Sequence, residues 1–421
     1  MTTAEVHRAI DAVWRIESAK LIAGLARITR DVGLAEDLAQ DALVAALEQW
    51  PQSGVPDNPG AWLMATGKRR AIDRFRRDKL LERKHDEILH SSDAAEDAAA
   101  ALDDAIDDHV GDDLLRLVFT ACHPVLSTDA RVALTLRLLG GLTTDEIARA
   151  YLVPEATIAQ RIVRAKRTLA DSKVPFEVPR GDEFTARLSS VLQVIYLIFN
   201  EGYSATAGED WTRPALCDDA LRLGRILAEL VPNEPEVHGL VALMEIQASR
   251  LRARVGPSGE PVLLMDQDRA RWDQLLIRRG FAALDRAEGL DVERGPYVLQ
   301  AAIAACHARA RTAAETDWRA IADLYAELQS LTPSPVIELN RAVAVAMAEG
   351  PGAGLAIVDR LRGEKALAGY HLLPAVRADF LTKLGRREEA RAELERAIEL
   401  TRNESERALM RARVEALGRA R

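Results

Sequence analysis

The segment from Leu142 to Leu169, LTTDEIARAYLVPEATIAQRIVRAKRTL, has the pattern of two short helices joined by a tight turn. Thr143 is a good N-cap for the first helix, and Glu146 three residues later completes a capping box. Val153-Pro154 ends that helix, because the residue before a proline disfavours the α region. Pro154 then suits the start of the second helix. The segment predicts a helix-turn-helix.

The second of these helices has an apolar face and a polar, basic one. The apolar face recurs at helical spacing and consists of Ile158, Ile162, Ala165 and Leu169. The opposite face carries Thr157, Gln160, Arg164 and Arg167, which can donate to phosphates and to base edges in a major groove. An arginine-rich helix face is often simply solvated, so this segment alone leaves DNA binding and an ordinary helix pair equally open.

The composition indicates an all-α protein of two or three domains. The chain has 421 residues, is 48% hydrophobic with only 5% aromatic residues, and lacks alternating Val/Ile/Thr blocks. Its three cysteines are isolated, which argues against a disulfide framework or a zinc site. Since no signal peptide or membrane-length apolar run is present, we expect a cytoplasmic protein that does not bind a membrane. We predict no cofactor, no metal and no enzymatic activity.

Charge is strongly segregated along the chain, although the net charge is −9. Residues 66–84 carry nine Lys/Arg and three Asp/Glu, and residues 155–173 carry five Lys/Arg and two Asp/Glu. Between these two basic segments, residues 85–113 carry eleven Asp/Glu and no Lys/Arg. This acidic, alanine-rich stretch is typical of a flexible linker. Local charge therefore indicates partners better than net charge does.

The first basic segment lies on a predicted helix that follows a loop rich in proline and glycine. Asn58 is a plausible N-cap with Pro59 at the first helical position. Arg70, Arg74 and Arg77 then line one face at spacings that repel one another. A polyanion would offset this repulsion, which indicates nucleic-acid contact. Pairing with the acidic linker is the alternative, and the two are compatible.

The order and spacing of these motifs resemble a bacterial RNA polymerase sigma factor of the extracytoplasmic-function type. The resemblance covers about residues 7–172 and rests on DLAQDALVAALEQW, NPGAWLMATGKRRAIDRFRR and the helix-turn-helix. It implies two helical domains, region 2 and region 4, joined by a linker. The implied partners are promoter DNA and core RNA polymerase, through its β′ clamp helices and β flap.

The resemblance also assigns roles to individual residues. The implied polymerase-binding residues are Asp37, Leu38, Gln40 and Asp41. The implied −10 contacts are Asp57, Asn58, Trp62, Lys68, Arg69, Arg70, Arg74 and Arg77, with a flipped base held by the loop at 51–58. The implied −35 readers are Thr157, Gln160, Arg161 and Arg164, with Lys166 and Arg167 on phosphates. Two departures are Gly67, where the helix would kink, and an acidic linker longer than expected.

The remaining residues, about 181–421, read as short helices separated by Pro/Gly/Asn turns, which suggests an α-solenoid. Residues 384–400 resemble half of a tetratricopeptide repeat, and Ala322, Ala356 and Ala390 are spaced by its period of 34 residues, although coincidence is an alternative. The extension resembles the tail of a sigma-factor subgroup, which implies a domain that inhibits or assists and binds a regulatory protein or peptide. Polar-aromatic turns near Tyr203, Trp211 and Trp272 could bind a ligand or cap helices.

We therefore predict an all-α chain with region 2 at 1–84, an acidic linker at 85–111, region 4 at 112–173 and a tetratricopeptide-like domain at 181–421. The leading hypothesis is a sigma factor that directs core polymerase to promoters and promotes DNA melting. The second is a helix-turn-helix regulator with a solenoid sensor that does not act as a sigma subunit. The third is a protein-binding scaffold whose basic patches only pair with the linker.

Overall fold

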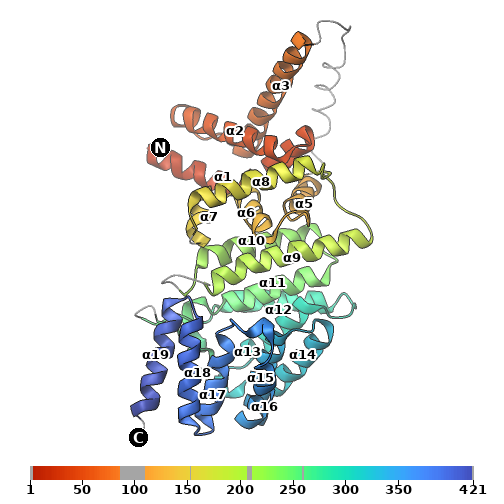
Figure 1. Cartoon of the computed structure of the whole chain (residues 1–421). Coiled ribbons are helices and arrows are strands. Elements are labelled where there is room, and N and C mark those ends of the chain that lie inside the picture. Colours follow the sequence, from red (N-terminus) through yellow and green to blue (C-terminus); the bar gives the residue numbers. More distant parts are fainter. Residues whose placement is uncertain (1–2, 86–109, 152, 206–210, 258–259, 420–421) are drawn as a thin grey trace. The chain divides into compact units, whose positions relative to one another are not determined.

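The computed structural model describes residues 3–85, 110–151, 153–205, 211–257 and 260–419. These residues form helices and turns without a strand, apart from one isolated bridge between Val255 and Pro261. The predicted all-α fold class is confirmed. The chain divides into two compact units, unit 1 (Met1–Ile195) and unit 2 (Tyr196–Arg421), whose helices are labelled in Figure 1.

Unit 1 contains two groups of helices. They are α1 (Thr3–Thr29), α2 (Val32–Ser53), α3 (Pro59–His85), α5 (Val110–Ala121), α6 (Thr128–Leu138), α7 (Thr144–Tyr151), α8 (Glu155–Asp171) and the first part of α9 (Asp182–Tyr203). The first group is α1–α3, in which buried Trp50 meets Trp62 edge-on with ring centroids 5.3 Å apart. The second is α5–α8, and α1 also packs on α5. Most of the predicted linker, residues 86–109, lies outside the described residues.

Helix α3 begins as the sequence predicted and continues without interruption through Gly67. The Asn58 side chain accepts a hydrogen bond from the Ala61 amide at 3.0 Å, and Pro59 is the first helical residue. Gly67 is buried against α1, and a Cβ there would lie 3.0 Å from Leu25 Cδ1. The close packing of α3 on α1 therefore accounts for the glycine at position 67, where the sequence predicted a kink.

Unit 2 is built from successive helices, most of which pack on their neighbours in the chain. They are the last part of α9, α10 (Pro214–Leu230), α11 (Pro235–Ala248), α12 (Gln274–Glu288), α13 (Pro296–Arg309), α14 (Trp318–Leu331), α15 (Pro335–Glu349), α16 (Pro351–Leu361), α17 (Leu372–Lys383), α18 (Arg387–Leu400) and α19 (Glu404–Arg419), with short 3₁₀ turns at Leu251–Ala253, Leu264–Asp266, Arg269–Arg271, Ala313–Glu315 and Lys365–Leu367. Neighbour-to-neighbour packing of this kind is typical of α-solenoids.

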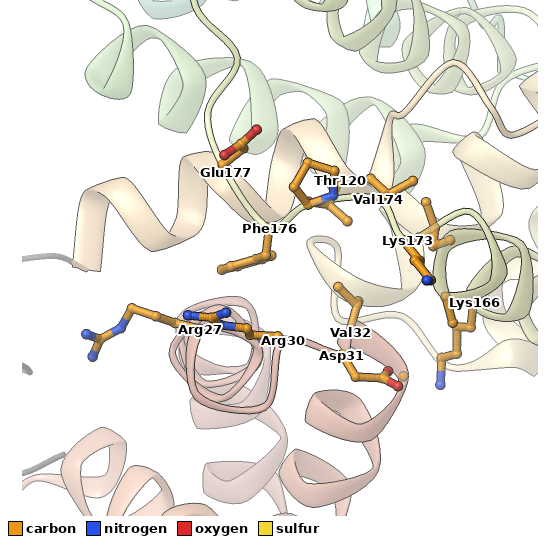
Figure 2. Close-up of a pocket in the computed structure, with 14 residues that line it drawn as sticks. Arg27, Arg30, Asp31, Val32, Thr120, Lys166, Lys173, Val174, Phe176 and Glu177 are labelled. Carbon is orange, nitrogen blue, oxygen red and sulfur yellow. The ribbon is translucent and has the colours of Figure 1, made fainter. Parts of the chain in front are cut away.

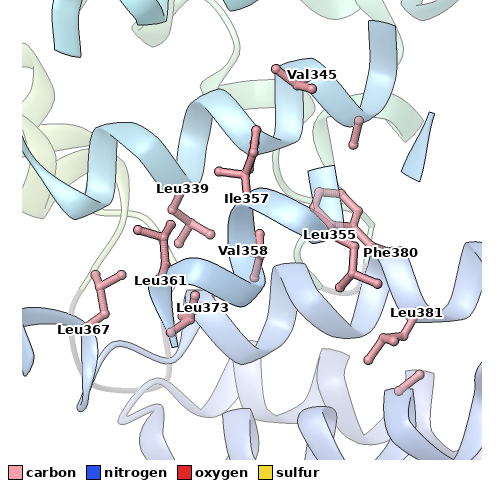
Figure 3. Close-up of a cluster of buried hydrophobic side chains, with 13 residues drawn as sticks. Leu339, Val345, Leu355, Ile357, Val358, Leu361, Leu367, Leu373, Phe380 and Leu381 are labelled. Atoms are coloured by element: carbon pink, nitrogen blue, oxygen red, sulfur yellow. The ribbon is translucent and has the colours of Figure 1, made fainter. Parts of the chain in front are cut away.

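The cores of unit 2 also lie between consecutive helices. One of them gathers side chains of α15, α16 and α17 around Val358 and Phe380, both almost fully buried (Figure 3). Residues 384–400, predicted to be the second half of a tetratricopeptide repeat, form a turn at Gly385 with φ +76° and then α18, in which Ala390 is completely buried. The 34-residue alanine spacing does not extend through α16, because Ala356 is exposed there. Within the described residues, no helix is long and apolar enough to cross a membrane.

Replacing Gly67 with valine should destabilise unit 1 by about 1–3 kcal/mol, because the new side chain overpacks the α1–α3 contact. Urea unfolding followed by circular dichroism measures the change. Gly352→Val is the matched control, since no atom lies within 4 Å of a Cβ at that helical position. Equal free energies of unfolding for the two variants would show that the α1–α3 contact accommodates the larger side chain without destabilisation.

Candidate nucleic-acid interface

The helix-turn-helix forms around the capping box that the sequence predicted. The Thr143 hydroxyl accepts a hydrogen bond from the Glu146 amide at 3.1 Å, and the Glu146 carboxylate accepts one from the Thr143 amide at 2.8 Å. These reciprocal bonds satisfy two amides at the start of α7. The turn ends at Pro154, which precedes the first residue of α8. Local sequence therefore accounts for where α7 begins and where α8 begins.

Helix α8 buries one face and exposes the other. Its buried residues are the four that the apolar periodicity predicted, Ile158, Ile162, Ala165 and Leu169. Of the predicted −35 residues, Gln160, Arg164 and Arg167 are exposed and Thr157 is half-buried. Arg161 pairs with Asp129 at 3.1 Å and Arg167 with Asp171 at 3.4 Å. Exposed pairs such as Arg167–Asp171 cost little to break, so that guanidinium remains available to a phosphate.

The predicted −10 residues lie on α3 and on the turn before it. Asp57, Arg69, Arg74 and Arg77 are exposed, while Trp62, Lys68 and Arg70 are half-buried. Arg70 pairs with Asp41 of α2, with 3.6 Å between Nη1 and Oδ2. The described part of α3 thus presents a basic face. One of its cations, Arg70, already pairs with Asp41, a residue predicted to bind polymerase.

Three of the four predicted polymerase residues are accessible on α2, and one is not. Asp37 and Asp41 keep 65% and 56% of their side chains exposed, and Gln40 is half-buried. Leu38 is only 2% exposed, so in this arrangement its side chain is not accessible to polymerase as predicted. The side chain lies on the inner face of α2, where it packs in the core of unit 1.

Glu36 of α2, which the sequence did not single out, joins the two helix groups. Its side chain is 3% exposed and contacts both Arg137 of α6, at 2.6 Å, and Lys166 of α8. Burial opposes ionisation of Glu36, but the charges of Lys166 and Arg137 outweigh it, so the pKa of this carboxyl lies below its ordinary value. The Gln40 amide donates a further hydrogen bond to it at 2.7 Å.

The contact at Glu36 links two surfaces that the sequence assigned to different partners. Lys166, predicted to hold a phosphate, is 19% exposed and also lies 3.8 Å from the Asp37 carboxylate. Beside it is a cavity of about 670 Å³, bordered by the α1–α2 turn, α8 and the segment after α8 (Figure 2). Protein interiors are close-packed. Between α2 and the second group, the contact therefore consists of a few charged side chains beside an open cavity, whereas α1 packs directly on α5.

Three family models match the chain. Sigma-70 region 2 matches residues 17–80, sigma-70 region 4 matches residues 116–169, and a family of unknown function (DUF6596) matches residues 187–288. Among curated relatives, an ECF RNA polymerase sigma factor, SigK of Mycobacterium ulcerans, is 31% identical over 34% of this chain and 75% of its own length. The chain belongs to the ECF sigma factor family.

Other relatives extend this result. An uncharacterised protein of Rhizobium meliloti is 45% identical over 93% of this chain and 92% of its own length. The probable ECF RNA polymerase sigma factor SigI of Mycobacterium tuberculosis H37Rv is 27% identical over 41% of this chain and 58% of its own. No solved structure matches. The sigma-type domains support a role as a sigma factor, and the extension after them is shared with the Rhizobium protein.

In the extension of this sigma factor, the polar-aromatic turns converge on buried arginines. The Arg254 guanidinium lies 3.8 Å from the ring centroid of Tyr203 and 4.4 Å from that of Trp211, and Arg250 lies over Trp272. Asp268 caps the 3₁₀ turn that follows it. These contacts give the turns a structural role through capping and cation–π packing.

Cys122 and His123, next to each other in region 4 before the helix-turn-helix, have the features of structural residues. Burial raises the pKa of the Cys122 thiol to about 11, and Thr135 lies within hydrogen-bond distance of it. Burial lowers the pKa of His123. No group of three potential metal ligands occurs among the described residues.

Replacing Glu36 with glutamine should lower the free energy of unfolding of unit 1 by about 1–3 kcal/mol, because two largely buried cations lose their carboxylate. Since the pKa of Glu36 is depressed in the folded chain, its contribution is complete above the unfolded value of 4.5 and is lost as pH falls through the folded one. Urea unfolding at pH 7 and at pH 3 measures both effects.

Asp145→Asn is the matched control for this substitution. It removes an exposed carboxylate that pairs with Arg149 at 3.0 Å, a type of pair that contributes under about 1 kcal/mol. A Glu36→Gln variant that unfolds like the Asp145→Asn variant, or whose deficit persists unchanged at pH 3, would contradict the role assigned to Glu36.

Proposed function

We propose that this chain directs core RNA polymerase to specific promoters and helps to melt them. The observation that carries the proposal is the presence, in one unit, of two basic helices in the order of regions 2 and 4, each with an exposed face. Helix α3 would hold the melted −10 strand through Arg69, Arg74 and Arg77, and α8 would enter the major groove at −35. The place of action would be the cytoplasm, and the role requires no catalytic residue.

Polymerase would bind the exposed face of α2, through Asp37, Gln40 and Asp41, by its β′ clamp helices, and region 4 by its β flap. Both carboxylates now lie near cations of the DNA-binding surfaces, Asp37 near Lys166 and Asp41 near Arg70. A partner that takes these carboxylates would weaken both contacts. Polymerase binding would therefore favour separation of the helix groups and release Lys166 for DNA.

Run-off transcription with core polymerase tests the proposal against a helix-turn-helix regulator. Specific transcripts should appear only when the chain and core polymerase are both present, and a charge reversal, Asp41→Lys, should reduce them about tenfold or more. Tight promoter binding by the chain alone, with no gain from polymerase, would favour the regulator.

Arg164→Ala and Arg167→Ala should differ in what they change. Loss of a base contact by Arg164 should relax −35 preference by about 1–3 kcal/mol at one position, whereas loss of a phosphate contact by Arg167 should weaken binding to all sequences and lower the salt slope by about 1. Competition binding across promoter variants and salt concentrations measures both. Equal relaxation by the two variants would show that the reading face of α8 is misassigned.

The extension would regulate or assist transcription, by binding a regulatory protein or peptide. A chain shortened after Ser172 is unsuitable as a test, because α9 belongs partly to unit 1. There Arg187 donates to the Phe119 carbonyl at 2.9 Å and Ser190 to the Cys122 carbonyl at 2.8 Å. A chain ending at Tyr203 keeps these bonds. Its run-off activity should rise if the extension inhibits and fall if it assists, and unchanged activity would contradict any role in transcription.

A further inference from the structure

The exposed face of α8 contains one large apolar side chain that the assigned contacts do not use. Val163 is 64% exposed, although it lies in the middle of a basic helix. It follows Gln160 by three residues and precedes Arg167 by four, so the three side chains share one face of the helix. Arg164, beside it, is also exposed.

The position of Val163 is not explained by packing within unit 1. The inner face of α8 consists of Ile158, Ile162, Ala165 and Leu169, all at most 6% exposed. A valine on the opposite face gains no burial, and its β-branch slightly disfavours the helix. Single exposed apolar residues are ordinary, but this one is surrounded by the side chains suited to base edges and phosphates.

In a major groove, the apolar group that a side chain of this kind can contact is the C5-methyl of thymine. Alanine, threonine methyl and aromatic groups make the same contact, and it needs no hydrogen bond. Valine brings two methyl groups on a stiff χ1, so little conformational entropy is lost when the contact forms.

We propose that Val163 is a specificity-determining residue that recognises a thymine methyl group within the −35 element. The inference rests on the proposed function, because it requires α8 to lie in the major groove. It adds one apolar contact to the polar ones, and it predicts that the preferred −35 sequence contains a thymine whose methyl group, rather than its hydrogen-bonding pattern, is read.

The test begins with the duplex that the full-length chain, together with core polymerase, selects from a library randomised over the −35 region. Each thymine of that duplex is then replaced singly by uracil, which removes only the methyl group. At one thymine the replacement should weaken binding by wild type about fourfold, the effect of one buried methyl group. The Val163→Ala variant keeps one methyl group, but that group lies closer to the helix backbone, so it should distinguish the thymine and uracil duplexes less than wild type does.

Val292→Ala, which changes an exposed valine of unit 2 (58% exposed), is the matched control and should discriminate like wild type. Alanine is the better helix former, so weaker binding by Val163→Ala cannot arise from a less stable α8. Coupling between residue and methyl group in this double-mutant cycle supports the inference. Uracil replacement that has no effect at any thymine, or the same effect in both proteins, overturns it while leaving DNA binding by α8 intact. Failure to select any duplex overturns the proposed function and the inference together.

Discussion

Two buried carboxylates connect the helix groups of unit 1. Asp113 of α5 pairs with Arg27 of α1 at 2.9 Å, and Glu36 makes the more extensive contact. Glu36 lies on α2, and both of its cationic partners come from the second group, Arg137 from α6 and Lys166 from α8. An isolated ionised carboxylate is too costly to bury, so Glu36 can stay inside only while these cations remain in place. The ion pair between Arg15 and Glu146 also joins the groups, but it is more exposed and contributes little.

The same interaction makes the docked arrangement reversible. Breaking it returns one carboxylate and two cations to water, where each regains the hydration that burial removed, so much of the lost Coulomb energy is recovered. Separation of a hydrophobic interface of equal area would recover no such hydration of charged groups. The Glu36 contact is therefore one that a charged partner can compete for, whereas the packing of α1 on α5 does not depend on it.

The features that the sequence predicted correctly depend on residues within a turn or two of one another. The capping box at Thr143, the cap at Asn58 and the buried face of α8 need no knowledge of the rest of the chain. Leu38 was assigned to a partner by the family resemblance, and only the packing of α2 shows that it is buried. Glu36 could not be recognised, because Arg137 lies 101 residues away in the sequence.

The docked arrangement constrains Lys166 more than the rest of the recognition helix. Its Cδ would lie 3.6 Å from a Cβ at Gly33, so its stem passes over the start of α2 and its ammonium reaches Glu36. Gln160 and Arg164 remain exposed in the same arrangement. Docking therefore occupies Lys166, the proposed phosphate contact, while leaving the proposed base-reading positions accessible. Because phosphate contacts set the salt dependence of binding, separation of the two groups should change affinity and salt slope more than sequence preference.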